Sequence, residues 1–155
     1  MKITIYAIGK LKEKHWQTAA HEYEQRLRRY TSYKVVEIKD TKPSGKSTSQ
    51  IQADESFRLL QRISPASFVV ALDKSGKSIN SETLANLLHE KSLYGPGELA
   101  FCLGGPHGFS GNFLQKTAQT LSLSKLTFPH ELARVILLEQ LYRAFTILNG
   151  EKYHK

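Results

Sequence analysis

The chain has 155 residues, of which 40% are hydrophobic and 23% are charged. This length and composition indicate one globular domain with a hydrophobic core and exclude an intrinsically disordered chain. Twenty-two Lys and Arg against fourteen Asp and Glu give a formal net charge of +8. This balance favours a polyanionic partner, with nucleic acid first, over a charge that serves only solubility.

Several kinds of protein are disfavoured by what the chain contains. Its single cysteine, Cys102, excludes internal disulfides and a Cys-rich zinc site, and its apolar neighbours predict an inert core residue. His and carboxylate residues form no tight grouping, so we expect no metal site. The start of the chain has no signal-peptide pattern, and no apolar run is long enough to span a bilayer. We therefore expect no membrane partner and a cytoplasmic location.

Strand and helix patterns alternate along the chain. Runs rich in β-branched and other apolar residues predict five strands, at residues 2–9, 34–39, 67–72, 99–103 and 121–124. Helical spacing predicts helices from about residue 14 to about 29, over 49–63, after a cap at Ser81, and over 110–120. In the second of these helices we expect Ile51, Phe57, Leu60 and Ile63 to point inward. Residues 40–50 read as a loop and residues 73–78 as a turn. The alternation predicts one α/β domain over residues 1–155 with a largely parallel sheet.

A final helix is predicted over residues 129–148, with Pro129 in its first turn, where a missing N–H costs no hydrogen bond. Its apolar residues recur at helical spacing along one face: Leu132, Val135, Ile136, Leu141, Phe145 and Leu148. The other faces also carry apolar residues: Ala133, Leu137, Leu138, Ala144 and Ile147. A helix that is apolar on several sides must be covered on several sides. We expect one of those covers to be a second subunit.

Nucleotide-binding motifs fail on inspection, but one glycine-rich loop remains. The stretches at Gly45 and Gly76 lack the first glycine of a phosphate loop, and the one at Gly95 precedes a strand instead of opening a helix. The loop at residues 104–108 follows a buried strand at its carboxyl end, where ligands bind in open α/β sheets. A tight turn that only requires positive φ explains the same glycines equally well. Asp73 also follows a strand, and is suited either to a ligand hydroxyl or to opening a turn.

Two further groups of polar residues are candidates for chemistry. Lys125, Thr127 and His130 lie in the connection before the last helix. Arg143 lies on that helix, and Tyr153 and His154 lie in the tail that follows it. A frayed, unimportant terminus is the common alternative for such a tail.

Several short motifs occur in a characteristic order: Ile8-Gly9-Lys10, Leu72-Asp73-Lys74-Ser75-Gly76, Leu103-Gly104-Gly105-Pro106-His107-Gly108, Leu121-Ser122-Leu123-Ser124, Thr127-Phe128-Pro129-His130, Arg134-Val135, Glu139-Gln140-Leu141-Tyr142-Arg143-Ala144 and Tyr153-His154. Each is weak alone, but together they are highly specific. On these motifs the whole chain resembles the ribosomal RNA large subunit methyltransferase H family of the SPOUT class. Residues 40–61 contribute little to the resemblance.

The resemblance implies a homodimer with a parallel sheet whose C-terminal part is threaded into a trefoil knot. Periodicity and spacing do not predict a knot, because true knots are rare. The resemblance further implies methylation of N3 of a pseudouridine in 23S rRNA, on the assembled ribosome, with S-adenosylmethionine as the methyl donor.

Individual residues also acquire roles from the resemblance. The implied cofactor-binding residues are Leu72, Gly104, Leu123, Ser124, Lys125, Leu126, Thr127 and Phe128. The tail is implied to lie at an active site that two subunits build together. Methyl transfer from a sulfonium is a direct displacement that depends mainly on alignment, but the N3 proton must still be removed. We expect His154, Tyr153 and Arg143 to be catalytic, with His130 as the second choice for the base.

Two other classes of function stay open at this point. One is a non-catalytic protein that binds RNA or the ribosome and has lost its cofactor site, although the intact glycine loop argues against that loss. The other is a small nucleotide-binding hydrolase, which has neither a phosphate loop nor a triad motif to support it. Equilibrium binding of S-adenosylmethionine separates these alternatives.

Overall fold

The computed structural model describes all residues, 1–155. A five-stranded sheet has the order β2-β1-β4-β3-β5, and every neighbouring pair is parallel. Its strands are β1 (Lys2–Ile8), β2 (Ser32–Ile38), β3 (Phe68–Ser78), β4 (Glu98–Leu103) and β5 (Gln119–Ser122). The helices are α1 (Lys14–Leu27), α2 (Thr48–Arg62), α3 (Ser81–Tyr94), α4 (Gly111–Gln115) and α5 (His130–Leu148). The predicted α/β class with a parallel sheet is therefore confirmed.

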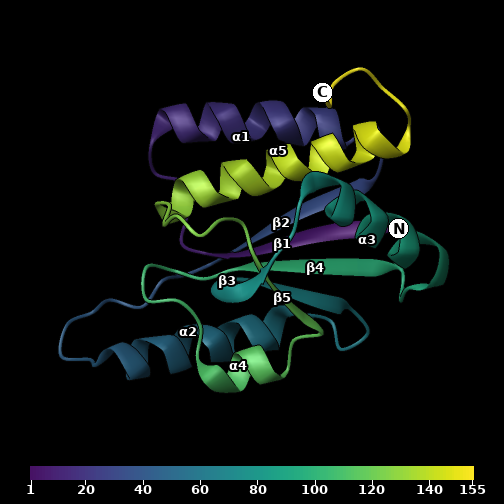
Figure 1. Ribbon diagram of the computed structural model, residues 1–155. Coiled ribbons are helices and arrows are strands. Elements are labelled where there is room, and N and C mark those ends of the chain that lie inside the picture. Colours follow the sequence, from purple (N-terminus) through teal and green to yellow (C-terminus); the bar gives the residue numbers. More distant parts are fainter.

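Helices cover both faces of the sheet (Figure 1). On one face α1, α3 and α5 pack against alternate residues of the central strands, such as Leu99 and Phe101 of β4. On the other face α2 and α4 pack against the residues between them, Ala100 and Cys102. This alternation follows from the two-residue period of a strand. Burial raises the pKa of the Cys102 thiol, so this side chain stays a neutral core group. No helix combines the length and hydropathy that crossing a bilayer requires.

The inward face of α2 is predicted correctly in part. Ile51 and Ile63 are buried as expected, but Phe57, which we expected to point inward, is 61% exposed. The buried side also carries Glu55 and Leu59, which follow Ile51 at intervals of four residues. Because a glutamate occupies the centre of this buried stripe, the apolar pattern of the sequence indicated a different face. Glu55 is 2% exposed, and it accepts a hydrogen bond from the amide of Thr41 at 2.8 Å.

The helix starts are mostly explained by side-chain caps. Ser47 and Gln50 form a capping box at α2, with each side chain accepting a hydrogen bond from the other residue's backbone N–H. At α3 the cap is Asn80 and not Ser81, because the Asn80 side chain accepts the amide N–H of Thr83 at 2.8 Å. Pro129 stands at the cap position of α5, one residue before the helix.

Strands β3 and β5 also differ from the prediction. Residues 73–78 are not a simple turn, because β3 continues to Ser78 with a register shift that pairs both Leu72 and Lys77 with Leu121. The helix predicted over residues 110–120 ends at Gln115, and β5 starts at Gln119, two residues before the predicted strand. Polar Gln119 and Thr120 pair with β3 at the edge of the sheet. Backbone pairing with β3, and not side-chain hydrophobicity, therefore makes these two residues part of a strand.

The backbone of β5 lies directly against β3 at Gly76. A Cβ atom at Gly76 would lie 2.5 Å from the carbonyl carbon and 2.7 Å from the nitrogen of Leu121. Both neighbours are backbone atoms of a paired strand, so neither can rotate away. Only a residue without a side chain fits at this contact.

Much of the apolar surface of α5 is covered within the chain. The helix packs against both α1 and α3 and lies over the sheet (Figure 1). Its buried residues include Leu137, Leu138, Leu141 and Ala144. Apolar character on several sides therefore does not by itself require a second subunit. The homodimer rests on the family resemblance and stays a prediction.

The contact at Gly76 gives a first test. Changing Gly76 to Ala should lower the free energy of unfolding by about 1–3 kcal/mol, because the added methyl group overlaps backbone that cannot repack. Chemical denaturation of both proteins measures this difference. Gly111→Ala is the matched control, because a Cβ there meets no atom within 4 Å and its φ is not positive. Equal stability of Gly76→Ala and the wild-type protein would contradict the close crossing of the two strands.

Candidate functional site

A cavity lies at the carboxyl ends of β4 and β5 and beside the register shift of β3, the strand between them. It encloses about 200 Å³. Its walls come from β3 at Leu72, where the register of that strand begins to shift, the loop after β4 at Gly104 and Gly105, the segment after β5, and the first turn of α5 at His130 and Ala133. Carboxyl ends of parallel strands are the usual place for a ligand in such sheets. The cavity is therefore the leading candidate for the functional site.

Most of the cofactor residues implied by the resemblance line this one cavity. They are Leu72, Gly104, Leu123, Ser124, Leu126, Thr127 and Phe128. Lys125 does not line it, and its side chain is exposed. Residues from three separate parts of the sequence are thus brought together. That they bind a cofactor stays a prediction.

The glycine loop of residues 104–108 is held in a tight turn and anchored to α2. The amide of Gly108, which has φ of +76°, donates a hydrogen bond to the carbonyl of Gly105 at 3.0 Å. The Gln52 side chain donates to the carbonyl of His107 at 2.7 Å. A Cβ at Gly105 would lie 3.0 Å from Oε2 of Glu55, so the backbone of the loop rests directly on that carboxyl group. The loop is therefore a tight turn, and its Gly104 and Gly105 also border the cavity. That the loop binds a ligand stays a prediction.

The segment after β5 leaves most of its backbone N–H groups without a protein partner. The Leu126 amide donates to Oγ of Ser124 at 2.9 Å, and the Ser122 hydroxyl donates to the carbonyl of Ser124 at 2.8 Å. No other amide of residues 123–128 forms a hydrogen bond within the protein. Unpaired backbone groups beside apolar Leu123 and Phe128 suit a ligand that combines a flat apolar ring with hydrogen-bonding edges. An adenine has this chemistry, so the cavity fits the adenosyl part of S-adenosylmethionine.

Three titratable side chains line the cavity: Asp73, Lys74 and His130. Asp73 accepts hydrogen bonds from both the amide and the hydroxyl of Ser75, at 2.9 and 2.6 Å. The Asp73 carboxylate is therefore held by a local contact within β3, at the register shift of that strand. His130, the second choice for the base, lies within this cavity.

The three predicted catalytic residues lie together, as one cluster. The guanidinium carbon of Arg143 lies 4.7 Å from the ring centroid of Tyr153, and its Nη1 lies 3.5 Å from Nδ1 of His154. Arg143 forms an ion pair with Glu139 at 2.5 Å, and the Tyr153 hydroxyl donates to the same carboxylate oxygen at 3.1 Å. His154 Nε2 lies 2.9 Å from Glu82 of α3. The tail is therefore held by specific contacts and is not a free end.

The protonation states of Arg143 and Tyr153 follow from burial and from the groups that contact them. The hydrogen bonds that Arg143 donates to the Glu139 carboxylate raise the pKa of Arg143, so the guanidinium stays charged. Burial, followed by hydrogen bonds with Tyr23 and Glu139, raises the pKa of Tyr153, so its phenol stays protonated at neutral pH. Tyr153 is thus suited to donate a hydrogen bond but not to remove a proton.

The cluster does not reach the cavity of its own chain. None of Arg143, Tyr153 and His154 lines that cavity. Ten residues of α5 separate Ala133 from Arg143, which is about 15 Å along a helix. Figure 1 shows the tail at the far end of α5 from the start of that helix. Within one chain the cavity and the cluster are therefore two separate sites.

Sequence reasoning missed the acidic partners of the tail. Glu139 joins Tyr153 to Arg143, and Glu82 holds His154. Glu139 had a detectable signal, because it lies four residues before Arg143 on the same helix face. Glu82 had none, because 72 residues separate it from His154.

Comparison with known proteins bears on the family and the fold of this chain. A family model described as a predicted SPOUT methyltransferase matches residues 1–154. Among solved structures, the chain is similar to a probable methylase family protein from Haemophilus influenzae Rd KW20, with a TM-score of 0.55 and 17% sequence identity. The likeness covers 99% of this chain and 70% of that chain, and at this identity it shows a shared fold alone. Because the family model matches nearly the whole sequence, the chain belongs to the SPOUT methyltransferase family.

Proposed function

We propose that this SPOUT methyltransferase uses S-adenosylmethionine to methylate N3 of a pseudouridine in 23S rRNA. We further propose that it works in the cytoplasm as a homodimer and acts on the assembled ribosome. The observation that carries the cofactor assignment is the cavity after β3, β4 and β5, where unpaired backbone N–H groups lie beside apolar side chains. The rRNA substrate rests on the resemblance, with support from the net charge of +8.

The proposal includes a trefoil knot in the C-terminal part of the chain. The contact of Gly76 with Leu121 supports it, because β5 pairs with β3 on both sides of the register shift and the two backbones approach closely there. The segment that leaves this crossing is residues 123–128, which line the cavity. Threading would therefore hold the backbone groups of the cofactor site in a fixed geometry.

The chemistry divides between the cavity and the tail. The bound cofactor would supply an electrophilic methyl group, and the protein has to align the pseudouridine ring and remove its N3 proton. His154 is our candidate for the proton acceptor. Arg143, kept charged by Glu139, would stabilise the negative charge that develops on the ring. Protonated Tyr153 would stack on the base or donate a hydrogen bond to it.

A second subunit is required for this division of roles. Along α5 the tail cluster lies about 15 Å from the cavity of its own chain. A homodimer that places the tail of one subunit at the cavity of the other would complete the site. In a monomer, His130 would be the histidine nearest to the reacting atoms, since it lines the cavity.

The cellular reaction tests the substrate directly. Mass spectrometry of 23S rRNA should show one methylated pseudouridine that is absent from cells lacking this protein. The modification should return when the wild-type gene is restored. Unchanged rRNA in the deletion strain would contradict the proposed substrate, and it would leave the family assignment in place.

Filling the cavity should block the cofactor. Changing Ala133 to Leu adds three carbon atoms to the cavity wall in the first turn of α5. Calorimetry should show at least about tenfold weaker binding of S-adenosylmethionine, because the leucine occupies space that the ligand needs. Ala133→Ser is the matched control and should bind nearly as the wild-type protein does. Equal affinity of all three proteins would place the cofactor elsewhere.

Removing the tail should separate chemistry from cofactor binding. Deletion of residues 152–155 should lower single-turnover methylation of unmodified ribosomes by about 100-fold or more, because it removes both the proton acceptor and the aromatic ring. Cofactor affinity and the dimer mass from light scattering should stay nearly unchanged. His154→Ala alone should reproduce part of the loss and alter the pH dependence of the rate.

Three results would contradict the role given to the tail. Wild-type methylation by the truncated protein would make the tail a passive end and transfer the role of base to His130. Loss of cofactor binding on truncation would make the tail structural. A monomer with full activity would remove both the dimer and the shared site.

A further inference from the structure

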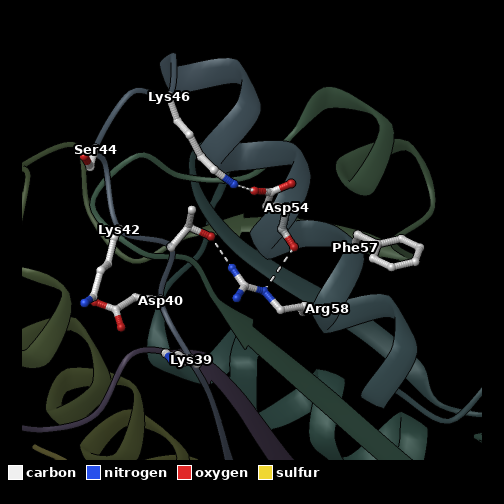
Figure 2. Close-up of a pocket in the computed structure, with 9 residues that line it drawn as sticks. Lys39, Asp40, Lys42, Ser44, Lys46, Asp54, Phe57 and Arg58 are labelled. Carbon is white, nitrogen blue, oxygen red and sulfur yellow. Dashed lines mark hydrogen bonds and ion pairs between the residues drawn. The ribbon is translucent and has the colours of Figure 1, made fainter.

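A basic hollow lies between α2 and the loop that follows β2, outside the cavity described above (Figure 2). We call it the α2 cradle. It encloses about 530 Å³ and is lined by four cations, Lys39, Lys42, Lys46 and Arg58. Two carboxylates, Asp40 and Asp54, also line it, so the formal charge of its lining is 4 − 2 = +2. The proposed cofactor does not use this hollow.

Two of the four cations of the α2 cradle are held by contacts within the protein, and the other two are not. Lys46 forms an ion pair with Asp54, and Arg58 donates hydrogen bonds to the Thr41 hydroxyl and to the carbonyl of Asp54. These contacts fix the loop against the helix, as the dashed lines in Figure 2 show. Lys39 and Lys42 form no ion pair, and both are exposed. The two lysines are therefore free to neutralise an external anion.

An exposed aromatic ring stands at the rim of the α2 cradle. Phe57 is 61% exposed, and its ring points away from the loop into solvent (Figure 2). It is the one hydrophobic residue among the nine that line the hollow. A membrane surface would call for several apolar side chains beside the cations. A single aromatic ring that lines the same hollow as two unpaired lysines fits single-stranded nucleic acid, in which bases stack on rings and phosphates contact cations.

Helix α2, which forms one side of the α2 cradle, also contacts the glycine loop of residues 104–108 that borders the cavity. Gln52 of α2 donates a hydrogen bond to the carbonyl of His107, at 2.7 Å. Glu55 accepts the Thr41 amide with one carboxylate oxygen, and its other oxygen lies under Gly105 without a hydrogen-bond partner. Both loops follow the carboxyl ends of their strands, β2 and β4, which lie two positions apart in the sheet, about 10 Å. A strand of RNA held on the α2 cradle would thus lie beside the cavity.

We propose that the α2 cradle is an RNA-docking site. In this site Lys39 and Lys42 bind backbone phosphates and Phe57 stacks on an unpaired base next to the nucleotide to be methylated. The proposal rests on the proposed function, in that it takes the substrate to be RNA. It adds the surface that holds the RNA and a division of work, with docking at α2 and methyl transfer at the cavity.

The experiment measures binding of a fluorescein-labelled RNA stem-loop with an unpaired loop to the full-length protein, by anisotropy over a range of salt concentrations. Lys39→Ala/Lys42→Ala should bind about tenfold more weakly, and its salt slope should fall by about 1.4, since each phosphate contact to a single strand contributes about 0.7. Phe57→Ala should bind about fivefold more weakly or worse with an unchanged salt slope, because stacking releases no counterions.

A matched control removes the same charge elsewhere. Lys34 of β2 and Lys116 after α4 are both exposed, and neither lines the α2 cradle. Lys34→Ala/Lys116→Ala should bind the RNA nearly as the wild-type protein does. Equal losses of RNA affinity in both double variants would show that only the net charge of the protein matters, and would overturn the proposal. Loss of binding to phosphatidylglycerol vesicles with RNA affinity unchanged would also overturn it, because the α2 cradle would then be a membrane contact.

A methylation assay distinguishes failure of the docking site from failure of the proposed function. In single-turnover methylation, Lys39→Ala/Lys42→Ala should raise the ribosome concentration needed for half-maximal rate, with the maximal rate and cofactor affinity unchanged. If wild-type protein fails to methylate ribosomes, the proposed substrate is wrong, and the RNA titrations still decide the docking site. Wild-type RNA affinity in both the double-lysine variant and Phe57→Ala would overturn the docking site even if ribosomes are methylated.

Discussion

The contact between the backbones of β3 and β5 at Gly76 is the constraint on which the rest of the site depends. No side chain fits between Gly76 and Leu121, so the two strands meet at main-chain distance. This contact sets where β5 ends, and thereby where residues 123–128 enter the cavity. The same segment then leads into α5, which covers one face of the sheet together with α1 and α3. We therefore expect a substitution at Gly76 to displace residues 123–128 at the cavity wall and the start of α5.

Polar groups of α2 and of the tail are organised by buried or half-buried carboxylates. Glu139 accepts hydrogen bonds from Arg143 and Tyr153 and helps to keep Arg143 charged, while burial, followed by the hydrogen bonds with Tyr23 and Glu139, keeps Tyr153 protonated. Glu55 lies almost fully buried between the loop after β2 and the glycine loop, and burial raises the pKa of its carboxyl group. Each carboxylate ties a surface segment to a rigid element. The candidate RNA-facing segments are thereby held in position without a hydrophobic core of their own.

The cavity, the tail cluster and the α2 cradle lie in three separate places in one chain, and this separation bears on the proposed reaction. The cavity lies at the start of α5, the tail cluster lies at its end, and the α2 cradle lies on the opposite face of the sheet from α5. A rigid helix cannot bring its own two ends together. A second copy of the chain can supply the missing end, which is why the homodimer and the shared active site stand or fall together.

The sequence by itself determined the strand and helix alternation, the parallel sheet and the glycine loop at a strand end, because apolar periodicity and glycine conformation are local properties. The sequence also placed Tyr153 and His154 among the candidate catalytic residues, because their motif resembles that of a known family and not because a physical argument required it. Only the tertiary structure decided that Glu55 and not Phe57 faces the sheet, that β3 continues past Asp73, and that Glu82 holds His154. The physical reason is the same in each case. Burial of a carboxylate, pairing of a polar edge strand and contact across 72 residues depend on groups that come together only when the chain folds.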